Sequence, residues 1–99
     1  MSYLENFYSM PTVHLIITGK VQGVFYRATA KSVADNIGIS GKVQNMQGGE
    51  VEIWASGTEE QLQRIITWCH EGSSGAHVDE VETAWTDDQS FEGFKIIRK

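Results

Sequence analysis

The residues with the clearest chemical potential lie in one short segment, 19–27, which reads Gly-Lys-Val-Gln-Gly-Val-Phe-Tyr-Arg. An apolar, strand-like run leads into this segment, and a helical pattern begins as it ends. The first N–H groups of a helix have no partner within the helix, and the helix dipole adds partial positive charge there. Arg27 places a planar guanidinium beside those groups, and Gly23 allows a bend with positive φ or the close approach of an anion. The segment therefore predicts a site for a phosphate or a carboxylate.

Taken singly, the polar candidates also have ordinary explanations. A glycine-bounded loop before a helix is often no more than a tight connection. Asn45 precedes the glycine-rich stretch 46–49, where an asparagine is commonly a turn residue. Arg27 favours a functional explanation, because a cation in the first turn of a helix is unfavourably placed against the dipole.

Length and composition indicate one small globular domain. The chain has 99 residues, 40% of them apolar, and a formal net charge of −5. Because an acidic domain repels a phosphate backbone, we expect no nucleic-acid partner. The longest apolar run is too short to span a membrane, and the first residues show no signal-peptide pattern, so we expect no membrane partner. We expect a loose leader at residues 1–11 and a single domain at residues 12–99.

Cys69 is the only cysteine of the chain, so an internal disulfide is excluded. This fits a reducing compartment, and we expect a cytoplasmic location. Its place on the apolar stripe of a helical segment favours a small buried side chain over a reactive thiol. His70 and His77 lie nearby in the sequence, but no further ligand-like cluster accompanies them, and we expect no metal site and no cofactor.

Hydrophobic periodicity divides the chain into strands and helices. The predicted strands are residues 13–18, 39–45, 51–55, 78–85 and 91–98, and the predicted helices are residues 26–37 and a segment that includes residues 62–69. Gly38 ends the first helix, and Thr58 with Gln61 forms a capping box that starts the second. The spacing of three between Val78 and Val81 predicts an irregularity in the fourth strand.

The resulting order is β-α-β-β-α-β with a short final strand. This order is typical of an α+β, ferredoxin-like split βαβ sandwich, in which two helices cover one face of an antiparallel sheet. Unrelated functions use this fold, so function has to be argued from the site.

Two motifs together resemble the acylphosphatase family. The segment 19–27 matches every fixed position of that family's first motif, glycine-x-valine-glutamine-glycine-valine-x-aromatic-arginine. The second motif is similar to residues 41–51, and its spacing from Asn45 to Gly49, Val51 and Gly57 agrees. Lys42 departs from the pattern, because the family usually has an aromatic residue there. The resemblance extends over residues 13–98.

The resemblance implies an enzyme that hydrolyses acyl phosphates to a carboxylate and inorganic phosphate. It implies that Arg27 binds the phosphoryl group and that Asn45 positions the attacking water. It also implies that the loop formed by Gln22, Gly23, Val24, Phe25 and Tyr26 contributes an amide cradle.

This chemistry suits the residues present. A carboxylate leaves without a general acid, and a loose phosphoryl-transfer transition state needs mainly positioning and positive charge. An arginine and a row of amides occupy the electrostatic role that a metal ion fills in other enzymes. We therefore expect metal-independent hydrolysis by a monomer, with inorganic phosphate or sulfate as competing anions.

Two other classes of function fit the same fold. One is a non-catalytic anion-binding or regulatory module, although the presence of both Arg27 and Asn45 opposes a degenerate site. The other is an RNA-recognition module, which the acidic charge and the absence of an aromatic-basic strand motif disfavour.

Overall fold

The computed structural model of the protein describes residues 10–98. Its elements follow the predicted order, and their bounds are β1 (Met10–Lys20), α2 (Tyr26–Ile37), β2 (Ser40–Asn45), β3 (Val51–Ser56), α3 (Glu59–Glu71), β4 (His77–Gln89) and β5 (Phe94–Ile96). The first strand is longer than expected, because Met10 and Pro11, assigned above to the leader, already belong to β1 and Met10 pairs with Gln89. The rest of the predicted leader, residues 1–9, lies outside the described residues.

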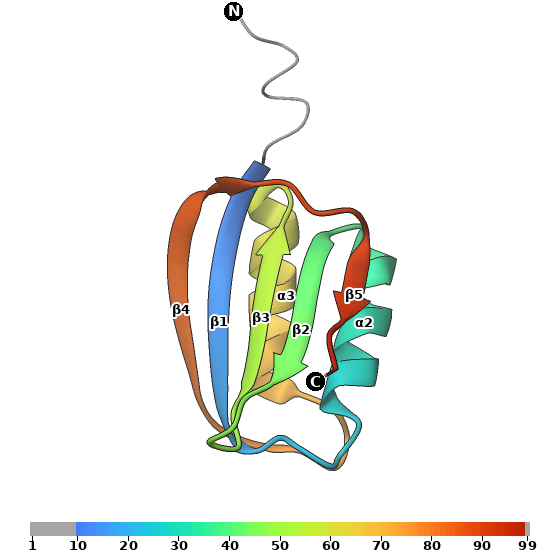
Figure 1. Ribbon diagram of the computed structural model, residues 1–99, viewed down its shortest axis with the longest axis vertical. Coiled ribbons are helices and arrows are strands. Elements are labelled where there is room, and N and C mark those ends of the chain that lie inside the picture. Colours follow the sequence, from blue (N-terminus) through green and yellow to red (C-terminus); the bar gives the residue numbers. More distant parts are fainter. Residues whose placement is uncertain (1–9, 99) are drawn as a thin grey trace, which may run out of the picture.

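The strands form one sheet in the order β4-β1-β3-β2-β5, and both helices cover the same face of it (Figure 1). The four long strands pair antiparallel, as predicted. The expectation of a wholly antiparallel sheet is wrong for β5, which pairs parallel with β2. The reason is the path of the chain: residues 90–93 cross the end of the sheet from β4 to the opposite edge, so β5 enters beside the start of β2 (Figure 1).

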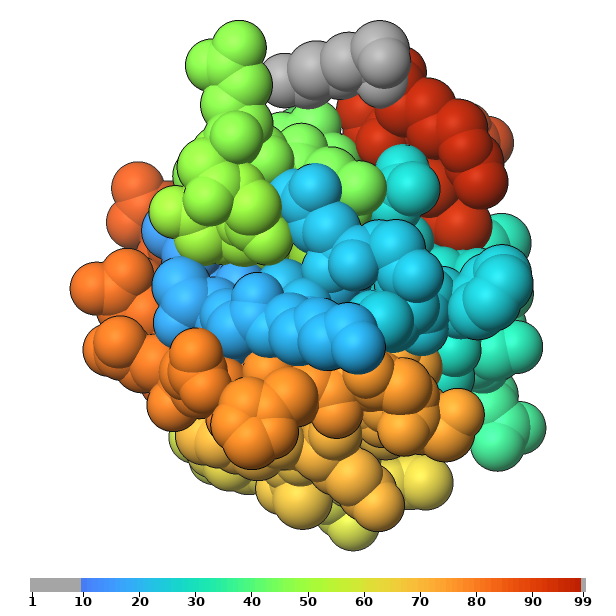
Figure 2. Space-filling view, turned by 90° about the horizontal axis from the view of Figure 1, so that it is seen from below, coloured from blue at the N-terminus to red at the C-terminus, as the bar shows by residue number. Residues whose placement is uncertain are grey.

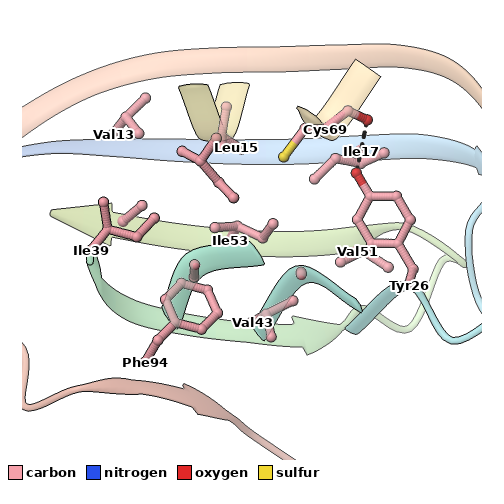
Figure 3. Close-up of a cluster of buried hydrophobic side chains, with 14 of the residues drawn as sticks. Val13, Leu15, Ile17, Tyr26, Ile39, Val43, Val51, Ile53, Cys69 and Phe94 are labelled. Atoms are coloured by element: carbon pink, nitrogen blue, oxygen red, sulfur yellow. Dashed lines mark hydrogen bonds between the residues drawn. The ribbon is translucent and has the colours of Figure 1, made fainter. Parts of the chain in front are cut away.

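The helix-facing side of the sheet forms the core (Figure 3). Alternate residues of the central strands point inward and are fully buried, namely Val13, Leu15, Ile17, Val51, Ile53 and Ala55. Ala30 and Ala34 of α2 and Leu62, Ile65 and Cys69 of α3 cover them from the helix side. Strand alternation and helix periodicity thus bury a single continuous core.

The irregularity predicted from the spacing in β4 is present there, opposite the end of β1, with Asp79 as the extra residue. The register between the two strands shifts between Thr18 and Gly19. Gly19 has φ of 126°, and a Cβ atom there would collide with the backbone of His77. The first glycine of the segment 19–27 is therefore required by the strand pairing just before the loop.

Tyr26, the first residue of α2, connects the two helices. Its hydroxyl donates a hydrogen bond to the carbonyl oxygen of Cys69 at 2.8 Å (Figure 3). The centroid of its ring lies 5.0 Å from that of Trp68. The bond satisfies one of the last carbonyl groups of α3, which have no partner within their helix. Burial raises the pKa of the Cys69 thiol to about 12. The prediction of a buried cysteine is confirmed, and such a thiol is protonated at neutral pH.

The opposite face of the sheet has a polar network centred on Glu52. Its carboxylate lies 2.7 Å from His14 Nε2 and accepts a hydrogen bond of 2.6 Å from Gln44 Nε2. The His14 ring stacks on Trp54 at 4.1 Å between centroids. Burial raises the pKa of Glu52, but the hydrogen bonds from Gln44 and His14 outweigh it and leave the pKa below its ordinary value of 4.5.

We predict that Glu52→Gln destabilises the protein at neutral pH by about 1–2 kcal/mol, because the hydrogen bonds to a charged acceptor are lost. A lowered pKa means that the folded state binds this proton more weakly than the unfolded chain does. The stabilisation by Glu52 is therefore complete above pH 4.5 and disappears as the pH falls through the lowered value. Urea unfolding between pH 3 and pH 7 should show the two stability curves converging in acid. Glu82→Gln, at an exposed position on β4, is the matched control. A constant difference between wild type and Glu52→Gln at all pH values would contradict the assignment.

Candidate active site

The loop between β1 and α2 has a backbone suited to binding an anion. Gly23 has φ of 76°, and Phe25 has φ of 62° and ψ of 24°, the left-handed conformation. Phe25 is followed directly by the right-handed helical residue Tyr26. A left-handed residue beside a right-handed one turns successive N–H groups toward the same point, which creates a concave anion-binding nest. The predicted amide cradle thus has a physical basis in the local backbone.

The two helices begin in opposite ways. Thr58 caps α3 with a complete capping box, and Glu59 and Glu60 occupy its first turn. In α2 no side chain caps the first N–H groups, and no acidic residue lies in the first turn. Arg27 is there instead. The N-terminus of α2 therefore keeps its donors and its partial positive charge available to a ligand, whereas that of α3 is neutralised internally.

A pocket of about 270 Å³ lies at this end of the molecule. Seen from below, the loop lies between the β2–β3 turn, the C-terminal segment and residues 72–76 (Figure 2). The residues that line the pocket are Val21, Gly23, Phe25, Tyr26, Arg27, Ala28, Asn45 and Arg98. The charged side chains among them are both arginines, and neither takes part in the four ion pairs formed within residues 10–98. The pocket is therefore strongly attractive to an anion.

Asn45 reaches the pocket from the last position of β2. Its cross-strand partner is Val51, which is buried on the helix-facing side, so the Asn45 side chain lies on that side too. The Oδ1 atom of Asn45 is buried and has no hydrogen-bond partner within residues 10–98. Buried acceptors are normally satisfied, so this oxygen can accept a hydrogen bond from a bound molecule.

The side chain of Gln22 binds the neighbouring turn, whereas the cradle prediction concerns only its backbone amide. The side chain does not line the pocket; Nε2 donates hydrogen bonds of 2.8 Å to the carbonyl oxygens of Met46 and Glu50. These carbonyls flank the β2–β3 turn, immediately after Asn45. Gln22 thus connects the cradle loop to the turn beside Asn45 and uses both of its N–H donors to do so.

Val24 also does not line the pocket. Its carbonyl oxygen accepts a hydrogen bond of 2.7 Å from Ser73 Oγ, and its side chain packs against the core and lies beside Gly75. Two hydrogen-bonding side chains therefore hold the loop from opposite sides, Gln22 from within it and Ser73 from the segment after α3. Of the five predicted cradle residues, Gly23, Phe25 and Tyr26 line the pocket.

Arg98 is the pocket residue that sequence reasoning missed. Ile96 pairs parallel with Val43, and the Ile97 N–H donates to the Val43 carbonyl oxygen at 2.8 Å. Arg98 and Asn45 each lie two residues beyond that pair, so the parallel pairing brings both to the same pocket. No local motif marks Arg98, because its position depends on the crossing of residues 90–93 between the sheet edges.

Within residues 10–98, no group of three or more His, Cys, Asp or Glu side chains could hold a metal ion. Both helices of this part of the chain are too short and too polar to cross a membrane.

Comparison with known proteins agrees with the motifs. The family model for acylphosphatase matches residues 13–96. The acylphosphatase of Haloquadratum walsbyi is 40% identical over 85 residues, which cover 86% of this chain and 91% of that protein. The acylphosphatase of Marinobacter nauticus is 50% identical over 68 residues, which cover 69% of this chain and 74% of that protein.

The fold agrees as well. The crystal structure of acylphosphatase from Bacillus subtilis has a TM-score of 0.87 to this structure at 30% sequence identity, and the match covers 90% of this chain and 100% of that chain. The family match extends from β1 through β5 and includes both motifs. The chain therefore belongs to the acylphosphatase family and is an enzyme that hydrolyses acyl phosphates.

Proposed function

We propose that the pocket between the cradle loop, Asn45 and Arg98 is the catalytic centre, and that it works without a metal ion. The observation that carries the proposal is the meeting, in one pocket, of an uncapped helix N-terminus, Arg27 and an unsatisfied Asn45 oxygen. Convergent donors and one acceptor suit a phosphoryl group together with the water that attacks it.

In the proposed reaction the phosphoryl oxygens occupy the nest, and the Arg27 guanidinium donates to two of them. Arg27 and the amides then stabilise negative charge on the transferring group. The oxygen of a water molecule attacks phosphorus as the bond between phosphorus and the carboxylate oxygen breaks. The products are a carboxylate and inorganic phosphate, and both water protons leave with the phosphate.

Asn45 supplies orientation in this scheme. Its Oδ1 accepts a hydrogen bond from the attacking water, which directs a lone pair of the water toward phosphorus. Its Nδ2 group donates to a phosphoryl oxygen. The neutral amide does both without adding negative charge beside the substrate.

The assignment extends to compartment and assembly. The active form is proposed to be a monomer, because the cradle loop, Arg27 and Asn45 that the proposed chemistry needs all belong to one chain. The lone, buried Cys69 supports a reducing, cytoplasmic location. Inorganic phosphate and sulfate are expected to compete with the substrate, because they fit the same nest.

The first test is hydrolysis of benzoyl phosphate in excess EDTA. We expect an unchanged rate, because Arg27 and the loop amides supply the positive charge. The loss of benzoyl phosphate is followed by ultraviolet absorbance, with and without inorganic phosphate as competitor. Activity that disappears with EDTA and returns with Mg²⁺ or Zn²⁺ would show that the proposed metal-free mechanism is wrong.

The second test separates the roles of Asn45 and Arg27. Asn45→Ala should lower turnover by about a hundredfold or more, the usual cost of losing one transition-state hydrogen bond in a dry site. It should keep the rise in melting temperature that phosphate causes in the wild type, because the nest and Arg27 remain. Arg27→Lys should lose much of that rise, because an ammonium group cannot donate the bidentate pair. A folded Asn45→Ala protein with near-normal turnover would reduce Asn45 to a turn residue.

The third test concerns Gln22 as a positioning residue. In Gln22→Glu the side chain cannot donate to the carbonyls of Met46 and Glu50, and we expect a loss of about 1–3 kcal/mol in stability. Because Asn45 then loses its fixed distance from the cradle, kcat should fall more than the affinity for phosphate does. Gln47→Glu adds the same charge at an exposed position of the neighbouring turn and is the control. Equal effects of the two substitutions would mean that charge alone matters and that Gln22 does not position the site.

A further inference from the structure

Phe25 is a phenylalanine in an unusual environment. The residue is 82% exposed, compared with 49% for Trp85, the other exposed large hydrophobic residue in the described part of the chain. It also lines the pocket that contains Arg27 and Asn45. An aromatic residue that contributes nothing to the core is therefore part of the lining of the proposed catalytic centre.

The backbone at Phe25 gives no reason for an aromatic residue. The nest requires a left-handed conformation there, with φ of 62° and ψ of 24°. Glycine adopts this conformation without steric cost and asparagine at a small cost, whereas a bulky side chain is unfavourable. The loop thus tolerates both backbone strain and an exposed apolar ring at this position. Such a combination at a ligand pocket indicates a function for the side chain itself.

The surrounding hydrogen bonds hold the backbone on both sides of Phe25. The carbonyl oxygen of Phe25 accepts bonds from the backbone N–H of Thr29 at 3.0 Å and from Thr29 Oγ1 at 2.8 Å. The preceding carbonyl, that of Val24, accepts the bond from Ser73 Oγ. Because the peptide groups on both sides of Phe25 are held, its Cα–Cβ bond has a defined orientation at the pocket.

We propose that Phe25 forms the acyl subsite of this enzyme and that it selects substrates with an aromatic or apolar acyl group. This proposal rests on the catalytic centre proposed above. With the phosphoryl group in the nest beside Arg27, the acyl group must project toward the open side of the pocket. Phe25 and Ala28 are the apolar residues of the lining that are exposed to solvent. A flat aromatic acyl group packs against the Phe25 ring, whereas an acetyl group is too small to cover it.

The test compares benzoyl phosphate with acetyl phosphate in the wild type, Phe25→Asn and Phe25→Tyr. Asparagine tolerates the left-handed backbone but removes the ring, and tyrosine keeps the ring. We expect Phe25→Asn to lower the ratio of kcat/KM for benzoyl phosphate to kcat/KM for acetyl phosphate about tenfold, mainly through the KM of benzoyl phosphate. Phe25→Tyr should keep the wild-type ratio. Because each ratio is compared with that of the wild type, the different intrinsic reactivities of the two substrates cancel.

Trp85→Ser is the control, since it removes the other exposed aromatic residue, on β4 and outside the pocket lining, and should leave the ratio unchanged. The subsite assignment is wrong if Phe25→Asn keeps the wild-type ratio. It is also wrong if this variant lowers kcat/KM equally for both substrates, because the side chain then affects only the loop. Failure of the proposed catalytic centre has a different signature: Asn45→Ala would hydrolyse both substrates at the wild-type rate.

Discussion

The hydrogen bonds from Gln22 to the carbonyls of Met46 and Glu50 are the contact on which the geometry of the proposed active site depends. The cradle follows β1, whereas Asn45 ends β2, and β3 lies between these strands in the sheet. Without a further contact, the distance between the cradle and Asn45 would depend only on the β1–β3 and β3–β2 strand pairings. The Gln22 amide adds a direct connection between the loop and the turn, so that the anion site and the residue beside it move as one unit. Small errors in position are costly for catalysis, which explains why a donor pair is used here.

The same end of the molecule contains several features that oppose stability. The first turn of α2 is uncapped, Arg27 opposes the helix dipole, and Phe25 is both exposed and left-handed. A stabilising interaction lies just behind these features, because Tyr26 is buried and bonded to Cys69 near the end of α3. The complete capping box of α3 lies at the opposite end of the molecule, where Gln61 also donates to the carbonyl oxygen of Ile37 at the end of α2. The fold thus satisfies the helix end that lies away from the site and leaves the donors at the site itself unpaired.

Much of this organisation could be predicted from the sequence because its signals are local. The alternation in β1 and β3, the apolar stripes of both helices and the box at Thr58 and Gln61 depend on residues close together in the chain. The loop and Arg27 were predictable for the same reason. The parallel pairing of β5, the arrival of Arg98 and the side-chain bonds of Gln22 were not, because each depends on contacts between distant segments. The backbone of Gln22 belongs to the predicted cradle loop, whereas its side chain binds the carbonyls of Met46 and Glu50 in the neighbouring turn.

The set of side chains at the pocket also explains why its chemistry suits acyl phosphates in particular. Among residues 10–98, the lining contains two arginines, an asparagine and a buried tyrosine, but no carboxylic acid and no histidine. Arginine does not release its proton in proteins, and burial raises the pKa of Tyr26 while its hydroxyl is committed to Cys69. No lining group is therefore placed to protonate a leaving oxygen. A carboxylate departs without that proton, whereas the alkoxide of an ordinary phosphate ester requires it. The lining thus favours reactive mixed anhydrides for two reasons. It binds the phosphoryl group, and it offers no proton to the leaving oxygen that a phosphate ester would need.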